Sequence, residues 1–185
     1  MNEGTKRDPA TGKVAGSRLW RLIRHRLLDE TDARRALGPA ALDRITARIA
    51  ASEQDHSGEI RVCVEAGLPL SYLWRGASAR ERAVSMFGKL RVWDTEANNG
   101  VLIYLLLAEH AIEIVADRGL ACHVEAGHWQ AIVTGMRDAF RQGRFEQGLM
   151  QAIAAVEAPL LRHFPLRAGE RNTNELPDRP HIGSA

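Results

Sequence analysis

The sequence is poor in cysteine and has no long apolar run. Its 185 residues contain only Cys63 and Cys122, which form no CxxC pair and no disulfide framework, so we expect free thiols. The longest apolar run, Val101–Ala108, is less than half of the ~20 residues that a helix needs to cross a bilayer. The polar beginning, MNEGTKRDPATGKVAGS, lacks the apolar segment of a signal peptide. These absences predict a cytoplasmic protein without a signal peptide or a transmembrane helix.

The short motifs of many enzymes are missing as well. There is no Gly-rich phosphate loop ending in Lys-Ser/Thr, no G-x-G-x-x-G, no H-E-x-x-H and no G-x-S-x-G, and no organic cofactor is implied. The closest histidines, His123 and His128, lack the spacing of paired helical ligands, which favours surface or capping roles. Aromatic residues make up 5% of the chain, and only Trp20 lies near the basic residues, so nucleic-acid binding by base stacking is not expected.

Basic residues are concentrated near the N-terminus, although the net charge is only +2. Helical spacing places Trp20, Ile23 and Leu27 on one face. The opposite face is basic and comprises Arg18, Arg21, Arg24 and His25. This pattern predicts a basic amphipathic helix that docks on the domain's own core. The alternative is that residues 18–28 contact an anionic membrane or an unidentified protein partner.

Strand patterns follow in three places. Residues 59–65 alternate, with Ile60, Val62 and Val64 on one face, and residues 101–107 are apolar on both faces, as in a central strand. Residues 111–116 are long enough to return as an antiparallel hairpin, which makes the sheet mixed.

Helices are expected around these strands. Ser78 and Glu81 have the spacing of a capping box before one of them. Helical periodicity marks four segments: 39–53, 78–90, 129–140 and 145–160. Their apolar surface is sufficient to cover both faces of a small sheet, so the fold class is α/β, a three-layer α/β/α sandwich with a small mixed sheet.

The composition divides the chain into four parts. We expect a flexible tail (1–17), the basic amphipathic helix (18–37), the α/β domain (38–164) and a polar, Pro-punctuated tail (165–185).

Polar residues at the strand ends are the candidates for a functional site. Asp94, Asn98 and Asp117 flank the central strand and its hairpin partner at the same end of the sheet. Such oxygen ligands suit a divalent cation such as Ca²⁺ or Mg²⁺, and Arg118 beside them could bind an anion. The alternative interpretation, which we favour, is that the two aspartates cap turns, that Asn98 forms one, and that Arg118 makes an ordinary ion pair.

A second polar group lies on the first strand. Glu59, Arg61 and Glu65 share one strand face, a spacing that predicts ion pairing at least as well as acid–base catalysis.

Several phrases of the sequence together resemble the TPM-domain family, particularly its short bacterial branch. These phrases cover roughly residues 39–180 and are SGEIRVCVE, RERAVSMFGKLRVWDT, NNGVLIYLLLAEHAIEIVADRGL, the Trp129-to-Met136 spacing, and HFP…NELPDRP. The phrase NNGVLIYLLLAEHAIEIVADRGL is the most specific of them. The resemblance implies an α/β/α sandwich and carries over two acidic positions, Asp94 in VWDT and Asp117 in ADRG.

The resemblance implies two kinds of function. Some family members are connected with divalent-metal binding and acid-phosphatase-like activity, and others with the assembly, repair or regulation of membrane complexes. The sequence lacks the secretory leader and the Gly-rich, membrane-anchored ending of many members. Because no catalytic set stands out, we expect a non-enzymatic accessory or interaction protein of the TPM-domain type, near a membrane surface or complex. The alternative is a divalent-metal-dependent phosphoryl hydrolase.

Overall fold

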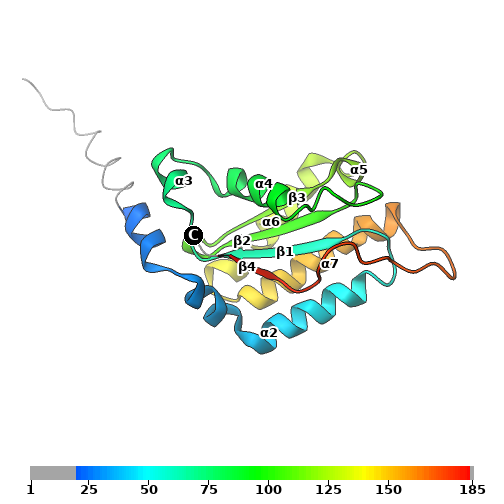
Figure 1. Cartoon of the computed structure of the whole chain (residues 1–185), viewed down its shortest axis with the longest axis horizontal. Helices are drawn as coiled ribbons and strands as arrows, with labels where there is room; N and C mark the ends of the chain where they lie inside the picture. The colour runs from blue at the N-terminus through cyan, green and yellow to red at the C-terminus, as the bar shows by residue number, and fades with distance from the viewer. Residues whose placement is uncertain (1–19, 184–185) are drawn as a thin grey trace, which may run out of the picture.

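A four-stranded mixed sheet forms the centre of the protein in a computed structural model, which describes residues 20–183. The strands are β1 (Ile60–Glu65), β2 (Val101–Leu106), β3 (Ala111–Ala116) and β4 (His181–Gly183), in the order β3-β2-β1-β4 (Figure 1). β1 is parallel to β2 and β4, whereas β3 is antiparallel to β2. All six side chains of β2 are buried, which confirms the central strand.

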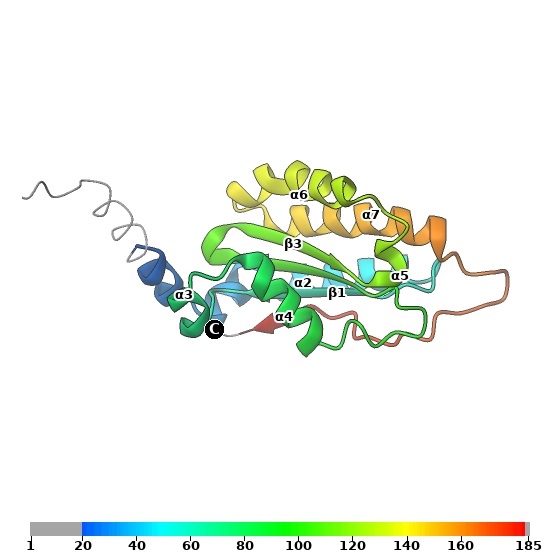
Figure 2. The same cartoon turned by 90° about the horizontal axis from the view of Figure 1, so that it is seen from above.

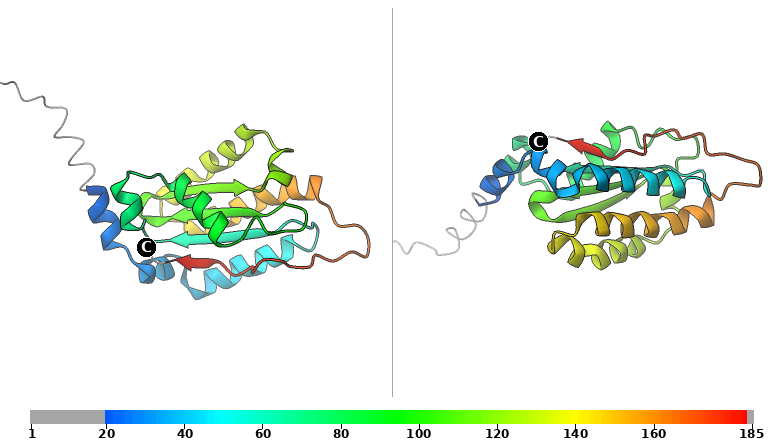
Figure 3. Two further views of the ribbon diagram at one scale, coloured as in Figure 1. Left: turned by 45° about the horizontal axis from the view of Figure 1, so that its top comes forward. Right: turned by 90° about the horizontal axis from the view of Figure 1, so that it is seen from below.

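Helices cover both faces of this sheet. On one face α2 (Glu30–Ser52), α6 (Ala126–Arg141) and α7 (Phe145–His163) pack on the apolar side chains of β1 and β2. On the other face α4 (Ala79–Lys89) and the short α3 (Leu70–Trp74) share a second core with Tyr104. Figures 2 and 3 show the resulting three layers, which confirm the expected α/β/α sandwich.

Capping residues set where two of the helices begin. Ser78 and Glu81 form the expected capping box at α4, and Asp29 and Asp32 form another at α2. Before α2, residues 20–27 are helical and residues 28–29 break the helix. Gly38, with φ 49°, kinks α2 at the boundary expected between the N-terminal helix and the domain. The expected tail over residues 1–17 lies outside the described residues.

The C-terminal segment differs from the expected polar tail. Residues 165–180 cross the domain, Leu176 is buried, and the segment ends in β4 against Cys63–Glu65. Polar side chains at the start of β1 hold it: Glu59, just before the strand, accepts the Leu176 N–H at 3.0 Å, and Arg61 donates to the carbonyl oxygens of Pro177 and Arg179. Because these contacts are polar, the segment has no apolar periodicity that would reveal its docking.

Two short elements complete the fold, η1 (Leu107–Glu109) in the β2–β3 hairpin and α5 (Arg118–Ala121) after β3. Within residues 20–183, no helix combines the length and apolarity needed to cross a membrane.

Candidate functional site

The structure brings together two of the three expected metal ligands. Asp94 lies in the turn after α4, where it forms an ion pair with Arg91. Asn98, with φ 51°, occupies the next turn, and its carbonyl oxygen accepts the N–H of Gly119 at 2.9 Å. Asp117 is 9% exposed, and its Oδ1 accepts the N–H of Arg118 at 2.7 Å and thereby caps α5. Asp94 and Asp117 therefore make the capping and pairing contacts of ordinary turn residues.

Arg118 lies with Asn98 and Asp117 in the corner that these turns form, but it makes no ion pair with Asp117. Its Nη2 lies 3.4 Å from Oδ1 of Asn98, while Glu113 faces Arg80 at 3.8 Å. The second oxygen of Asp117, Oδ2, is buried and has no hydrogen-bond partner.

The three expected ligands are not equally available to a cation. Asp94 is engaged by Arg91, which leaves Asn98 and Asp117. Across residues 20–183, no three His, Cys, Asp or Glu side chains are arranged to hold a metal. The corner is thus better described as a pair of turns with one unsatisfied carboxylate oxygen.

Glu59, just before β1, and the charged residues of β1 contact different partners. Arg82 of α4 forms a bidentate pair with Glu65, and the Tyr104 hydroxyl donates to Glu65 at 2.8 Å. Glu59 and Arg61 bind the C-terminal segment instead. The expected ion pairing along one strand face is therefore replaced by contacts with other elements, and none of the three residues is placed for acid–base chemistry with another.

Two buried acids near the start of β1 have unusual environments. Burial raises the pKa of Glu53 to about 8, although its Oε1 accepts the Ile60 N–H at 2.8 Å. Burial also raises the pKa of Glu59. Sequence reasoning missed Glu53, because an acid in the polar stretch after a helix gives no periodic signal of burial.

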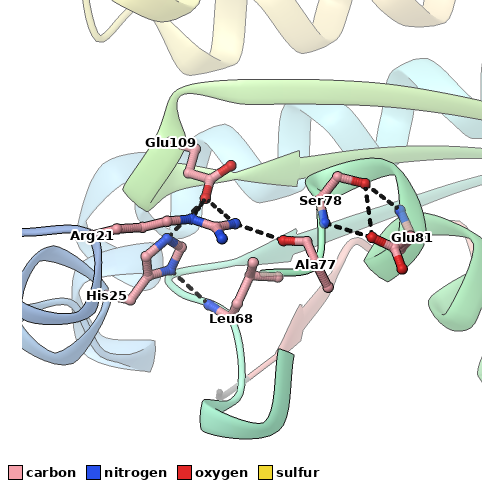
Figure 4. A network of polar contacts seen from close by, with 7 residues as sticks. All are labelled: Arg21, His25, Leu68, Ala77, Ser78, Glu81 and Glu109. Atoms are coloured by element: carbon pink, nitrogen blue, oxygen red, sulfur yellow. Dashed lines mark hydrogen bonds and ion pairs between the residues drawn. The ribbon is translucent and has the colours of Figure 1, made fainter. Parts of the chain in front are cut away.

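The N-terminal helix docks on the domain through its polar side (Figure 4). Arg21 contacts Glu109 of η1 at 2.7 Å and donates to the carbonyl oxygen of Ala77 at 2.7 Å. His25 is 3% exposed; its Nε2 lies 3.0 Å from Glu109, and its Nδ1 accepts the N–H of Leu68 at 2.9 Å. Burial would raise the pKa of Glu109, but hydrogen bonds from His25 and Arg21 outweigh it and lower that pKa.

Close backbone packing supports this docking. A Cβ atom at Gly67 would lie 2.8 Å from the carbonyl oxygen of His25, so only glycine allows the loop after β1 to approach the helix this closely.

The apolar side of the helix consequently faces outward. Trp20, Ile23 and Leu27 are 66%, 39% and 73% exposed. On the adjacent α3, Leu70 and Trp74 are 48% and 83% exposed. Helix 20–27 and α3 lie side by side at one end of the molecule (Figures 1 and 2). We call these five residues the apolar end. The docking that we favoured from the sequence occurs, but through the face opposite to the one that periodicity indicated.

Three arginines are exposed next to the apolar end. Arg24 and Arg26 are exposed on the helix, and Arg75 is exposed directly after α3. The guanidinium of Arg75 lies over the Tyr72 ring, 4.4 Å from its centroid, and 3.6 Å from Glu81. The arrangement is an apolar surface with a basic margin.

Comparisons with known proteins agree with this fold. The TPM domain family matches residues 31–158, which is more than half of the chain. The BA42 protein of the psychrophilic bacterium Bizionia argentinensis, solved by NMR, is similar in structure, with a TM-score of 0.68 and 28% sequence identity over 80% of this chain and 95% of that protein.

A more distant structure shares the fold. The N-terminal domain of a P. gingivalis protein has a TM-score of 0.57 at 21% identity, covering 71% of this chain and 82% of that domain. Among proteins of curated function, none matches the chain. From the match over residues 31–158 and the α/β/α sandwich, the chain belongs to the TPM domain family.

Proposed function

We propose that this chain is a non-enzymatic accessory protein that attaches to anionic membrane surfaces through its apolar end. The observation that carries the proposal is the exposure of Trp20, Leu27 and Trp74, at 66%, 73% and 83%, on two adjoining elements. Large apolar side chains that gather on a surface mark interaction sites, whereas scattered ones are ordinary. Tryptophan prefers the membrane interface, because its ring is apolar and its N–H can remain hydrated.

The docking contacts explain how the apolar face stays available. If helix 20–27 were held by its apolar face, burying Trp20 and Leu27 would stabilise the docked helix and hide both residues. Instead, Arg21 and His25 fasten the opposite side to Glu109. The helix therefore presents its apolar face at a fixed orientation and does not have to leave the domain to bind lipid.

The basic margin suits a negatively charged surface. Arg24, Arg26 and Arg75 are exposed beside the apolar end. Each basic residue near an anionic leaflet contributes about 1 kcal/mol to binding, and this contribution decreases as salt screens it. The partner implied is thus an anionic membrane surface, with the apolar side chains entering the interface.

Co-sedimentation with vesicles tests the proposal. The full chain is mixed with vesicles of phosphatidylcholine alone or with phosphatidylserine, at low and high salt. We expect binding to the anionic vesicles at low salt, weakened by salt and by the double substitution Trp20→Ala/Trp74→Ala. Trp93→Ala is the matched control, because Trp93 is 49% exposed but lies between α4 and β2, at the other end of the sheet.

Two outcomes would contradict the proposal. One is no sedimentation with anionic vesicles at low salt, where attraction is strongest. The other is that the double variant and Trp93→Ala lose vesicle binding to the same extent, while circular dichroism shows that all variants are folded.

Metal-dependent phosphoryl hydrolysis is the second candidate function. The observation in its favour is Oδ2 of Asp117, buried without a partner beside Asn98 and Arg118. A cation at Asp117 would satisfy this oxygen, and Arg118 would attract a phosphate. A phosphatase panel with Mg²⁺, Mn²⁺ or Ca²⁺ should then show an activity that Asp117→Asn abolishes. Activity unchanged in Asp117→Asn would place any reaction elsewhere.

A further inference from the structure

β3 forms an edge of the sheet with backbone groups that point outward. It pairs with β2 alone. The Asp117 N–H donates to the carbonyl oxygen of Gly100, at the end of the β2–β3 pairing. Because the backbone groups of alternate residues point the same way along a strand, the N–H and C=O groups of Val115 and Glu113 also point toward β2. Ile112, Ile114 and Ala116 therefore direct their N–H and C=O groups away from the sheet.

One outward group already has a donor from another element. Nη1 of Arg80, on α4, lies 2.5 Å from the carbonyl oxygen of Ile114. The contact confirms the outward direction of Ile114 and shows that a donor can reach the edge from outside. The Arg80 side chain is half exposed, so this donor is replaceable.

A groove of about 480 Å³ runs along this edge. Arg80 of α4 lines one side, and Trp129, Gln130 and Val133 of α6 line the other. The groove continues along β3 to its end and then to α5, through Glu113, Ile114, Ala116 and Ala121. Its two sides differ in chemistry: the α6 side carries the apolar Trp129 and Val133 with Gln130 beside them, and the α4 side carries Arg80.

We propose that this groove binds an extended, uncharged peptide segment of a partner protein as an added strand beside β3, with apolar side chains at alternate positions facing α6. The backbone of such a strand would bond to Ile112, Ile114 and Ala116, and successive side chains would point to opposite walls. Apolar side chains on one side would meet Trp129 and Val133.

Charge favours an uncharged segment. Arg80 and Glu113 are the charged residues that line the groove, and they lie 3.8 Å apart. An acidic peptide side chain near Arg80 would also approach Glu113, and a basic one near Glu113 would also approach Arg80. A peptide N–H that replaced Arg80 at Ile114 would release the guanidinium to pair more closely with Glu113. The groove thus balances its own charges and selects by shape and apolarity.

A second copy of the chain fits this edge poorly. α6 packs against β3 and α7 and forms a wall of the groove at the edge itself. Two copies joined through β3 would place their α6 helices over neighbouring strands about 4.8 Å apart, whereas packed helices need 8–10 Å between axes. A single extended segment brings no such helix.

A phage-displayed library of random heptapeptides, panned against the full chain, tests this proposal. We expect selected peptides with uncharged, apolar residues at every second position. A synthetic peptide from one clone should slow amide exchange at Ile112, Ile114 and Ala116. Ala116→Pro removes one outward N–H and leaves the bonds to β2, since proline is tolerated on an edge, so the peptide should bind about tenfold more weakly.

Further variants separate the walls from the edge. Trp129→Ala should weaken binding of the peptide, and this test remains valid even if Ala116→Pro disturbs folding. Val84→Ala, which truncates an exposed α4 residue outside the groove lining, should bind as the parent does. Arg80→Gln should bind at least as tightly, because the Ile114 carbonyl becomes free.

Three results would overturn the proposal. They are no enrichment of peptides on panning, equal binding by Trp129→Ala and the parent chain, and a dimer in light scattering that Ala116→Pro dissociates. The last result would make a second copy the occupant. Each is independent of vesicle binding, so this proposal and the membrane proposal can fail separately.

Discussion

The backbone N–H of Leu68 donates to Nδ1 of His25 at 2.9 Å, so a side chain of the N-terminal helix completes the backbone bonding of the loop after β1. Because Nδ1 accepts, the ring proton of neutral His25 lies on Nε2 and faces Glu109 at 3.0 Å. One buried imidazole therefore links three segments that are distant in the sequence.

Replacing this imidazole should loosen the helix. His25→Ala leaves the Leu68 N–H without its partner and removes one of two donors to Glu109. We expect the free energy of unfolding to fall by about 1–3 kcal/mol, measured by urea denaturation. Arg24→Ala, on the exposed side of the same helix, should change it by less than about 0.5 kcal/mol. Equal effects of the two substitutions would mean that His25 does not hold the helix.

The pKa of Glu53 should make stability depend on pH. Burial raises this pKa from 4.5 to about 8, so the folded chain favours the neutral carboxyl. The resulting stabilisation is complete below the unfolded value of 4.5 and is lost as the pH rises through about 8. The free energy of unfolding should therefore decrease over this interval, by on the order of a few kcal/mol.

Urea denaturation of Glu53→Gln between pH 5 and pH 9 measures this contribution. The variant keeps an oxygen for the Ile60 N–H but cannot ionise, so its stability should depend less steeply on pH and exceed that of the parent above about pH 8. Some dependence should remain, because burial also raises the pKa of Glu59. Glu96→Gln, at an exposed position, is the control; an unchanged slope in Glu53→Gln would contradict the assignment.

Apolar patterning predicted the layers of the fold, because burial of β2 and of the helices depends on local periodicity. Val101–Leu106 is apolar on both faces and is indeed central. Ser78 and Glu81 cap α4 through contacts three residues apart, which a short motif can encode. Family resemblance supported the same architecture through the phrases around these elements.

Apolar patterning and short motifs did not predict the contacts between polar residues that are distant in the sequence. Arg21 and His25 dock on Glu109, more than 80 residues away, and reverse the orientation that amphipathicity indicated for the helix. β4 has three residues, too few to show an alternating pattern. At the expected metal corner, Asn98 meets Arg118, whereas Asp94 pairs with Arg91. Except for the Arg91–Asp94 pair, whose members are only three residues apart, each outcome depends on a partner that becomes adjacent only after folding.

The pair between Glu65 and Arg82 should show the largest single-residue effect on stability. Their side chains are 1% and 5% exposed, and the Tyr104 hydroxyl donates a further hydrogen bond to Glu65. Arg82→Ala removes the cation and leaves a buried carboxylate, which typically costs about 3–5 kcal/mol. Urea denaturation should show this loss. The double variant Glu65→Gln/Arg82→Met removes both charges and should recover most of it, because the Tyr104 hydroxyl can still donate to the amide oxygen that replaces the carboxylate. A double variant no more stable than Arg82→Ala would show that packing against α4, and not the unpaired charge, determines the loss.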